Sequence, residues 1–285
     1  MSSLRLFIKE IRPEHTFFAL PFAYTGAVFA AHGIPSWWAL LWITLAVVGA
    51  RTAAMAANRY LDRDIDKANP RTARRALATG ALAPSAMLWA IGLGLALLLI
   101  AAWQLNPLCV KLMPIAAIGV LAYPLCKRFT WMTHFVLGAV DGFAPLGAYI
   151  GITGTISWPA ILIFLAVTVW VAGFDIAYAL MDLPTDTAQG ISSLPARFGE
   201  RAGRSLPIAL HLLMGALLLF AGLLARPGWP YYVGIAAVVA LVAKELADHR
   251  TSPNVFVLNE RIFIANMVFS VIFLVTTVAG FALVR

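Results

Sequence analysis

The chain has 285 residues, of which 61% are hydrophobic and only 12% are charged, and its mean hydropathy is +0.85. A soluble domain of this length would not keep so few charged residues, so the composition excludes an ordinary soluble protein and predicts several membrane spans. The net charge of +8 does not indicate a nucleic-acid partner, because the basic residues lie between apolar runs, where membrane topology explains them.

The first residues are expected to lie on the membrane surface. Residues 3–12 mix apolar and charged side chains at near-helical spacing, and Pro13 follows them. This pattern predicts an interfacial amino-terminal helix within residues 1–13. Glu10 and Glu14 precede the first apolar run, and acidic residues at that place, with eight more spans behind them, argue against a cleaved signal peptide.

Nine apolar runs follow, each long enough to cross a hydrocarbon core of about 30 Å as a helix. They predict an all-α membrane protein in which nine transmembrane helices form one bundle, a single domain over residues 1–285. The expected spans are residues 16–33, 36–60, 82–104, 108–125, 133–151, 159–181, 205–225, 229–247 and 262–284.

Lysine and arginine are distributed unequally between the two sets of connections. Most lie in the amino-terminal arm and after the even-numbered spans, whereas the opposite connections hold little more than Lys111 and Arg226. The positive-inside tendency therefore places the amino terminus and two long polar connections, residues 61–80 and 182–204, in the cytoplasm. We expect a multi-pass protein of the cell (inner) membrane, with these connections over a site that faces the cytoplasm.

Three carboxylates and two arginines end the second apolar run, between residues 58 and 66. Asn58, Asp62 and Asp66 follow one another at intervals of four, so a helix places them within roughly 80° of one face, while Asp64 points away. Oxygen ligands on one helix face at the mouth of a span suit a hard cation such as Mg²⁺. Taken alone, the stretch fits a solvated helix end with charge pairs equally well.

A second acidic pair, Asp182 and Asp186, follows the sixth span and opens on the same side of the membrane. Pro184 is expected to break the helix, so the spacing alone does not put both carboxylates on one face. Carboxylates gathered at one mouth repel one another unless a cation bridges them. Because Mg²⁺ commonly binds one or two carboxylates together with substrate phosphates, the two groups suggest a diphosphate held through metal ions.

Basic residues near both groups are available to bind the same anion, since lysine and arginine are charge-assisted donors to phosphate oxygens. The alternative for each of them is a topology signal without a ligand. The candidates for diphosphate binding are Arg59, Arg63, Arg71, Lys127 and Arg128.

Two further aspartates are expected inside spans, where an ionisable side chain is costly and is a functional hypothesis by default. Asp175 lies two turns before Asp182, so it is a candidate base or an acceptor for a substrate hydroxyl. Asp141 has the same options, and its alternative is a structural ion pair with Lys127 or Arg128.

The two acidic groups and their surroundings resemble the signature motifs of the UbiA-type intramembrane aromatic prenyltransferases. The motifs are residues 58–66 (Asn-x-x-x-Asp-x-x-x-Asp) and residues 182–186 (Asp-x-x-x-Asp). Residues 123–130 (Tyr-Pro-Leu-Cys-Lys-Arg-Phe-Thr) look like the family's loop after the fourth span. Residues 173–178 (Gly-Phe-Asp-x-x-Tyr) look like the frame of the second motif, and the resemblance covers about residues 12–200.

Within that family, the 4-hydroxybenzoate polyprenyltransferases of quinone biosynthesis are the most similar group. Residues 14–21 and 129–134 look more like relatives in the futalosine route to menaquinone, which are thought to prenylate a dihydroxynaphthoate. One departure is Arg-Ala-Leu-Ala at residues 75–78, where relatives tend to have Arg-Pro-Leu-Pro. The resemblance implies transfer of a polyprenyl group to a 4-hydroxybenzoate-type aromatic acid for ubiquinone or menaquinone, with 1,4-dihydroxy-6-naphthoate as the alternative acceptor.

The resemblance also implies roles for the candidate residues. Polyprenyl diphosphate would ionise in a Mg²⁺-dependent step, and the phenolic ring would attack the allylic carbon. Asp175 and Tyr178 would orient or deprotonate the phenol, while the prenyl tail lies among apolar spans open to membrane lipid. The implied metal ligands are Asn58, Asp62, Asp66, Asp182 and Asp186.

Two other functions are compatible with acidic residues in a membrane protein. A cation-coupled transporter would place its charges near the membrane midplane, flanked by broken helices in two repeats. Here the carboxylates crowd one membrane face, and the sequence shows no clear repeat. A CDP-alcohol phosphotransferase would carry Asp-Gly-x-x-Ala-Arg before paired aspartates, and this sequence lacks that motif.

Overall fold

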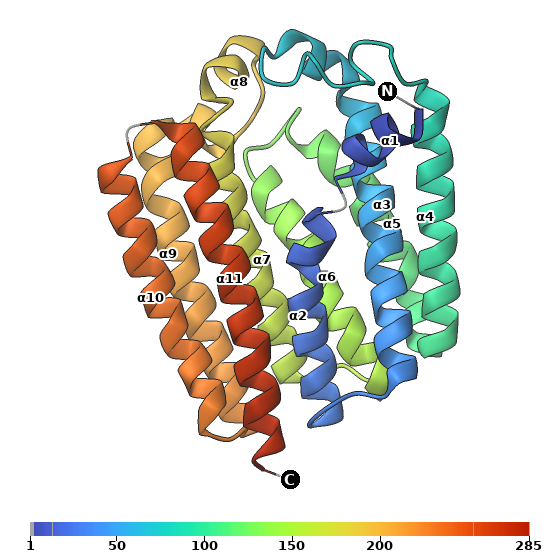
Figure 1. Cartoon of the computed structure of the whole chain (residues 1–285), viewed down its shortest axis with the longest axis vertical. Helices are drawn as coiled ribbons and strands as arrows, with labels where there is room; N and C mark the ends of the chain where they lie inside the picture. The colour runs from blue at the N-terminus through green and yellow to red at the C-terminus, as the bar shows by residue number, and fades with distance from the viewer. Residues whose placement is uncertain (1–2, 13, 253, 285) are drawn as a thin grey trace.

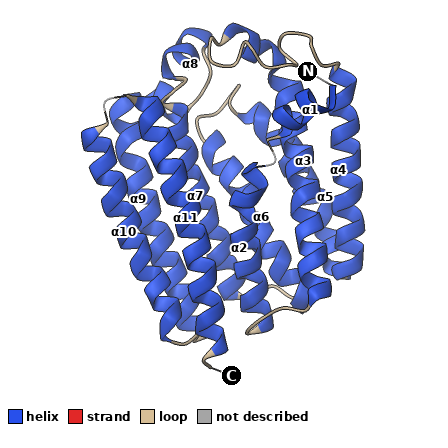
Figure 2. Ribbon diagram, viewed as in Figure 1, coloured by secondary structure: helices blue, strands red, loops and turns tan. Residues whose placement is uncertain are grey.

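The computed structural model describes residues 3–12, 14–252 and 254–284, and within these residues it contains eleven helices and no strand. Figures 1 and 2 show one bundle, with the short helices α1 and α8 toward the same end. The all-α fold class is therefore confirmed. The helices are α1 (Ser3–Ile11), α2 (Glu14–Ala31), α3 (Trp37–Ala68), α4 (Pro84–Leu105), α5 (Pro107–Cys126), α6 (Thr133–Thr153), α7 (Trp158–Ala179), α8 (Leu183–Gln189), α9 (Leu194–Ala225), α10 (Trp229–Thr251) and α11 (Val255–Ala282).

Eight of these helices, α3 to α7 and α9 to α11, are long and apolar enough to cross a membrane. They correspond to eight of the nine expected spans, and the chain is a multi-pass membrane protein. The first expected span, residues 16–33, falls in α2, whose described apolar part, Phe18–Ala31, is shorter than the other eight helices. The count of nine spans and the side of the membrane on which the connections lie stay predictions.

The expected amino-terminal helix is present as α1. Its Leu6 and Phe7 are partly buried against Ala76 and Leu77 of the connection between α3 and α4. The expected end of this helix at Pro13 lies outside the described residues. Leu6 and Phe7 thus face the protein, at the end of α3 that carries the first acidic motif, whereas Ile8 of the same helix is exposed.

One continuous helix carries the first acidic motif. α3 begins after Ser36, whose side chain accepts a hydrogen bond from the backbone N–H of Ala39 at 3.2 Å. It ends at Ala68, because Pro70 disfavours helical geometry at the preceding residue, the C-cap Asn69. With 32 residues, α3 is longer than a single span requires, and its last turns form the polar end of the bundle.

The second polar connection is more helical than its composition indicates. α7 ends at Ala179, and Pro184 lies in the first turn of α8, where its missing N–H costs nothing. The expected break is present, but it precedes Pro184. α9 begins at Leu194 rather than at residue 205, because Ser193 caps it, and it bends at Gly199, whose φ of 85° favours glycine.

Aromatic packing fixes α7 at the centre of the bundle. Trp170 is 1% exposed, and the rings of Phe18 and Phe22 of α2 lie 4.5 and 4.6 Å from it between centroids. The indole N–H of Trp170 donates to Asn266 Oδ1 of α11 at 2.5 Å. α7 therefore contacts α2 and α11 as well as α6 and α9, and it carries Asp175 from this fixed position.

α3 and α4 cross at a contact between two glycines. A Cβ atom added to Gly94 would lie 2.6 Å from the carbonyl oxygen of Gly49, and one added to Gly49 would lie 2.6 Å from that of Gly94. Small residues at such crossings let helix backbones approach each other closely in membranes. The contact therefore requires glycine at both positions.

Replacing Gly94 by alanine is expected to lower the thermal unfolding temperature of the detergent-solubilised protein, because the added methyl group forces two backbones apart at a cost of roughly 1–3 kcal/mol. Gly92→Ala on the same helix is the matched control, since nothing lies within 4 Å of its added Cβ. The control should unfold at the wild-type temperature or slightly above it, because alanine favours helix over glycine. Equal unfolding temperatures for the two variants would contradict the close contact.

Candidate active site

A polar cavity of about 260 Å³ is lined by Asp186 of α8 and by side chains of the connection between α3 and α4. Both segments lie toward the same end of the bundle (Figure 1). The cavity wall combines side chains from α3, α6, α7 and α8 with side chains from that connection. Both acidic motifs reach it, although they lie far apart in the sequence. The cavity lining includes all five candidate metal ligands, Asn58, Asp62, Asp66, Asp182 and Asp186.

The last turns of α3 present one polar face to the cavity. Asp62 and Asp66 are 1% and 7% exposed, and the Asn58 amide Nδ2 donates to Asp62 Oδ2 at 2.8 Å. The Asp64 side chain is 75% exposed and points away, as the helical spacing predicts. Helix geometry alone therefore separates the cavity carboxylates from the solvated one.

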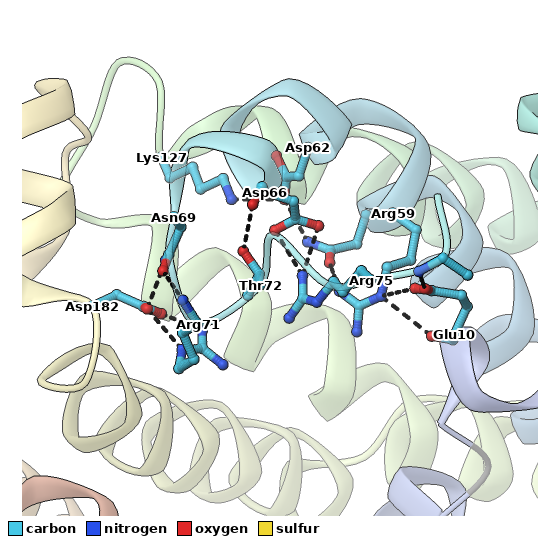
Figure 3. Close-up of polar contacts among 12 residues, drawn as sticks. Glu10, Arg59, Asp62, Asp66, Asn69, Arg71, Thr72, Arg75, Lys127 and Asp182 are labelled. Atoms are coloured by element: carbon cyan, nitrogen blue, oxygen red, sulfur yellow. Dashed lines mark hydrogen bonds and ion pairs between the residues drawn. The ribbon is translucent and has the colours of Figure 1, made fainter. Parts of the chain in front are cut away.

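The two buried carboxylates of α3 each face a basic side chain (Figure 3). Lys127 Nζ, at the end of α5, lies 2.6 Å from Asp62 Oδ2. Arg75 Nη1 lies 2.7 Å from both oxygens of Asp66. Charge-assisted hydrogen bonds of this kind compensate a carboxylate that burial would otherwise destabilise.

The connection between α3 and α4 also binds the second acidic motif. Arg71 donates to Asp182 through Nε at 2.8 Å and through Nη2, and Asn69 Nδ2 donates to the same carboxylate at 2.8 Å. Arg71 Nη1 also donates to the hydroxyl of Tyr178 at 3.2 Å. This bidentate pair joins the two halves of the cavity wall, as Figure 3 shows.

Asp186 lies on α8 and is 8% exposed. Burial raises the pKa of its carboxyl to about 6; the charge of Asp182 adds to the rise, and a hydrogen bond with Ser193 opposes it. The ionised form of Asp186 is thus less stable in this position than in water, and a bound cation would stabilise it.

The donor set fits a hard divalent cation that takes one or two carboxylates from the protein. Within the described residues, no three His, Cys, Asp or Glu side chains are grouped so as to hold a metal ion by themselves. Mg²⁺ usually completes its coordination with water and substrate phosphates, so a closed protein cage is not required. Among the described residues, buried Asp62 Oδ1 has no hydrogen-bond partner, which leaves one anionic oxygen available to a cation.

Three of the five candidate diphosphate-binding residues, Arg59, Arg71 and Lys127, line the cavity. Arg59 is buried, donates through Nη1 to Asn58 Oδ1 at 2.9 Å, and pairs with Glu10 of α1 at 3.2 Å. α1 is thereby attached to the cavity wall through a buried ion pair.

The other two candidates, Arg63 and Arg128, are not part of the cavity lining. Arg63 follows Asp62 by about 100° around the helix and lies beside the exposed Asp64, 3.8 Å from its carboxylate. Arg128 donates to the backbone carbonyl of Leu61 on the outside of α3. Their nearness to the motifs in sequence does not bring them into the cavity.

Asp141 pairs with neither Lys127 nor Arg128. Its Oδ1 accepts a hydrogen bond from Arg51 Nη1 of α3 at 3.0 Å, because both side chains lie deeper in the bundle than the end of α5. The expected structural pairing is therefore present with a different partner. Arg51 Nε is buried and has no hydrogen-bond partner in the part of the chain that the structure describes, so one donor of this guanidinium is free there.

Asp175 also lines the cavity, and its Oδ2 lies 2.7 Å from Nδ1 of His134 on α6. The Asp175 side chain is 29% exposed, whereas that of His134 is 3% exposed. Tyr178, one turn further along α7, lies under the guanidinium of Arg71, 5.3 Å from its ring centroid. Both candidate catalytic side chains of α7 therefore reach the cavity.

A second cavity, of about 270 Å³, lies between α3, α4, α5 and α6 and has almost entirely apolar walls. Arg51 and Asp141 line both cavities. Their ion pair thus marks the boundary between a polar space at the end of the bundle and an apolar space within it.

Sequence reasoning did not assign a role to Arg51, Asn69 or His134, all of which line the cavity. Arg51 carried a usable signal, because an ionisable residue inside an expected span marks function by default. Asn69 lies in a connection where many polar residues are simply solvated, and His134 is a polar residue at the start of an expected span. Nothing in their spacing separates them from surface residues.

A family model described as the UbiA prenyltransferase family matches residues 19–266. The chain is 34% identical over 238 residues to a 4-hydroxybenzoate octaprenyltransferase of Alkalilimnicola ehrlichii, covering 81% of this chain and 79% of that protein. It is also 34% identical over 222 residues to the Cupriavidus metallidurans protein of the same name, covering 75% and 73%.

Solved structures show the same fold. The apo structure of a UbiA homologue from Aeropyrum pernix K1 matches with a TM-score of 0.79 and 29% identity, over 95% of this chain and 98% of that one. A UbiA homologue from Archaeoglobus fulgidus bound to GPP and Mg²⁺ matches with a TM-score of 0.70 and 20% identity, over 96% and 99%. Because the identity is only 20%, the match to the Archaeoglobus fulgidus structure shows a common fold and nothing more.

Proposed function

Because this chain belongs to the UbiA prenyltransferase family, we propose that it transfers a polyprenyl group from polyprenyl diphosphate to a 4-hydroxybenzoate-type aromatic acid. The observation that carries the proposal is the junction of two cavities, one lined by two acidic motifs and one apolar. A charged diphosphate and a long hydrocarbon chain on one molecule need these two environments side by side. The 4-hydroxybenzoate octaprenyltransferase name shared by relatives at 34% identity supports this acceptor class.

The polar cavity would bind the diphosphate. Asn58, Asp62, Asp66, Asp182 and Asp186 would hold Mg²⁺, which supplies positive charge to the leaving diphosphate. Lys127, Arg71 and Arg59 would donate to phosphate oxygens in the same space. Lys127 and Arg71 bind Asp62 and Asp182 in this structure, so both side chains are already held where the anion would lie.

The apolar cavity would take the prenyl chain. The allylic C–O bond breaks, and its electron pair leaves with the diphosphate, so the terminal carbon becomes cationic. Apolar walls such as those of α3 to α6 keep water away from this carbon. Water would otherwise attack the allylic cation before the acceptor does.

The acceptor would lie between Arg51 and Asp175, which line the same polar cavity. The free buried Nε of Arg51 would donate to the acceptor carboxylate. Asp175, with Tyr178 nearby, would orient the phenol and take its proton as the ring carbon next to the hydroxyl bonds to the allylic carbon. The ring carbon then loses its hydrogen as a proton, and Asp175 returns the phenolic proton to the oxygen. The phenol is thereby restored, and the reaction releases diphosphate and one proton.

The distribution of lysine and arginine supports an inner-membrane location with the polar cavity toward the cytoplasm, in a single nine-span domain. Quinone biosynthesis would be the use of the product, for ubiquinone or menaquinone. The futalosine-route acceptor, 1,4-dihydroxy-6-naphthoate, remains the second candidate because it is also a hydroxylated aromatic acid.

Asp66→Ala and Asp182→Ala are each expected to lower prenyl transfer by roughly 10²-fold or more, because each removes charge aimed at the reacting diphosphate. Transfer of a labelled polyprenyl group in membranes, with and without EDTA, measures this effect. Asp64→Ala is the matched control on the same helix and should retain the wild-type rate within roughly twofold, since its carboxylate is exposed. Wild-type rates for Asp66→Ala and Asp182→Ala, or full activity in EDTA, would rule out the metal clamp.

The acceptor is tested by competition. With 4-hydroxybenzoate and 1,4-dihydroxy-6-naphthoate offered together with one labelled polyprenyl diphosphate, label is expected mainly on 4-hydroxybenzoate. Label mainly on the naphthoate would select the menaquinone alternative. If neither compound is labelled while the donor still binds, the acceptor assignment is wrong.

Arg51→Met is expected to raise the KM for the aromatic acid by roughly tenfold or more, because the variant lacks the buried guanidinium that would bind the carboxylate of the acceptor. The matching carboxamide of the acceptor serves as a control for general damage to the site. The KM values for the acid and the carboxamide should differ strongly in the wild type and little in the Arg51→Met variant. An unchanged preference for the acid would exclude Arg51 as the carboxylate-binding residue.

A further inference from the structure

His134 occupies a buried position between three helices. It is 2% exposed, lies in the first turn of α6, and contacts α7 through one ring nitrogen and the start of α9 through the other. Neither acidic motif contains it. It is therefore a buried titratable group next to a candidate base, without an assigned role.

The hydrogen bonds of His134 fix its tautomer. The backbone N–H of Leu194 donates to His134 Nε2 at 3.1 Å. A backbone N–H only donates, so Nε2 is the acceptor nitrogen and the single proton of the neutral ring is on Nδ1. Nδ1–H then donates to Asp175 Oδ2 at 2.7 Å.

The start of α9 supplies the reason for this arrangement. Leu194 is the first residue of α9, and the first N–H groups of a helix have no partner within the helix. His134 Nε2 satisfies one of them. Nε2 is thereby occupied as the acceptor of the Leu194 N–H, and Nδ1 is the ring nitrogen that faces Asp175.

Asp175 is held by this contact on one side only. Within the described part of the chain, its Oδ2 bonds to His134 and its Oδ1 makes no hydrogen bond, while the side chain is 29% exposed at the cavity.

We propose that His134 is a positioning residue for Asp175: its hydrogen bond to Oδ2 holds the carboxylate in place, with Oδ1 turned to the phenol of the acceptor. The inference rests on the proposed transfer function. In the reaction the phenolic proton passes to Asp175 Oδ1, the electron pair of the broken O–H bond stays on the phenol, and His134 keeps its Nδ1 proton throughout. His134 itself takes up no proton, because Leu194 occupies its acceptor nitrogen.

Two amide substitutions separate the two hydrogen bonds of His134. The side-chain nitrogen of asparagine is bonded to Cγ, as Nδ1 is, so His134→Asn keeps a donor toward Asp175 and loses the acceptor for Leu194. The terminal group of glutamine falls at the place of Nε2, so His134→Gln keeps the acceptor for Leu194 and loses the donor toward Asp175. If His134 served only to accept the hydrogen bond from Leu194, His134→Gln would lower the activity less than His134→Asn.

The test measures kcat on a series of 4-hydroxybenzoates that carry halogens, keep one free ring position beside the hydroxyl, and have decreasing phenol pKa. On the parent acceptor, His134→Gln should lower kcat roughly 30-fold, within the range for an impaired general base, and leave KM for polyprenyl diphosphate unchanged. His134→Asn should stay within roughly threefold of the wild type. The loss in His134→Gln should shrink as the acceptor becomes ionised before binding, because no proton then has to be removed.

The variant Asp175→Asn tests whether His134 acts on the reaction through Asp175. If His134 acts through Asp175, the double variant Asp175→Asn/His134→Gln should be no slower than Asp175→Asn alone. A loss in His134→Gln that is the same for every acceptor, equal losses in the asparagine and glutamine variants, or additive losses in the double variant would each overturn the positioning role.

The acceptor series also separates this inference from protein folding and from the proposed function. The ratio of rates between acceptors does not depend on how much of a variant is folded, so a poorly folding variant still gives the answer. A wild type that prenylates no phenol refutes the proposed function, and the positioning role falls with it. A wild type that prenylates phenols while His134→Gln shows a constant loss refutes the positioning role alone.

Discussion

Buried carboxylates at the end of an apolar bundle need cations, and this requirement determines how the polar connections fold. An unpaired buried carboxylate costs several kcal/mol, and basic side chains offset this cost at Asp62 and Asp66, whereas Asp186 has a hydrogen bond with Ser193. Two of the bases are far from their carboxylates in the sequence: Lys127 at the end of α5 reaches Asp62, and Arg71 of the connection after α3 reaches Asp182. Arg75 of the same connection lies only nine residues from its partner Asp66. That connection therefore closes over the cavity through its own arginines. The pairs are Lys127 with Asp62, Arg75 with Asp66 and Arg71 with Asp182.

Under the proposed function, the same pairs explain how the cavity remains stable before the substrate arrives. Each carboxylate neutralises a base that would otherwise repel its neighbours, and each base holds a carboxylate that burial disfavours. Bound diphosphate and Mg²⁺ would provide both sets with new partners of the right sign. The two open acceptor atoms, Asp62 Oδ1 and Asp175 Oδ1, and the free Nε of Arg51 then mark where new contacts form.

A second polar network in the carboxyl-terminal half shows the contrast. His211 Nδ1 lies 2.6 Å from Glu245 Oε2, and Asn266 Nδ2 donates to Glu245 Oε1 at 2.8 Å. His211 Nε2 lies 3.1 Å from the carbonyl of Trp170, so both oxygens of Glu245 and both nitrogens of His211 have partners. Fully paired and fully buried, this network ties α7, α9, α10 and α11 together and has nothing left for a ligand.

The sequence by itself determined the helical membrane class, the face shared by Asn58, Asp62 and Asp66, and the outward direction of Asp64. These follow from composition and from the period of one helix, which are local properties. Only the tertiary structure decided that Arg51 pairs with Asp141, that Arg63 and Arg128 stay outside the cavity, and that His134 binds Asp175. Such pairings depend on how helices cross and where α7 gives way to α8, and close glycine contacts and aromatic packing between distant segments set those crossings.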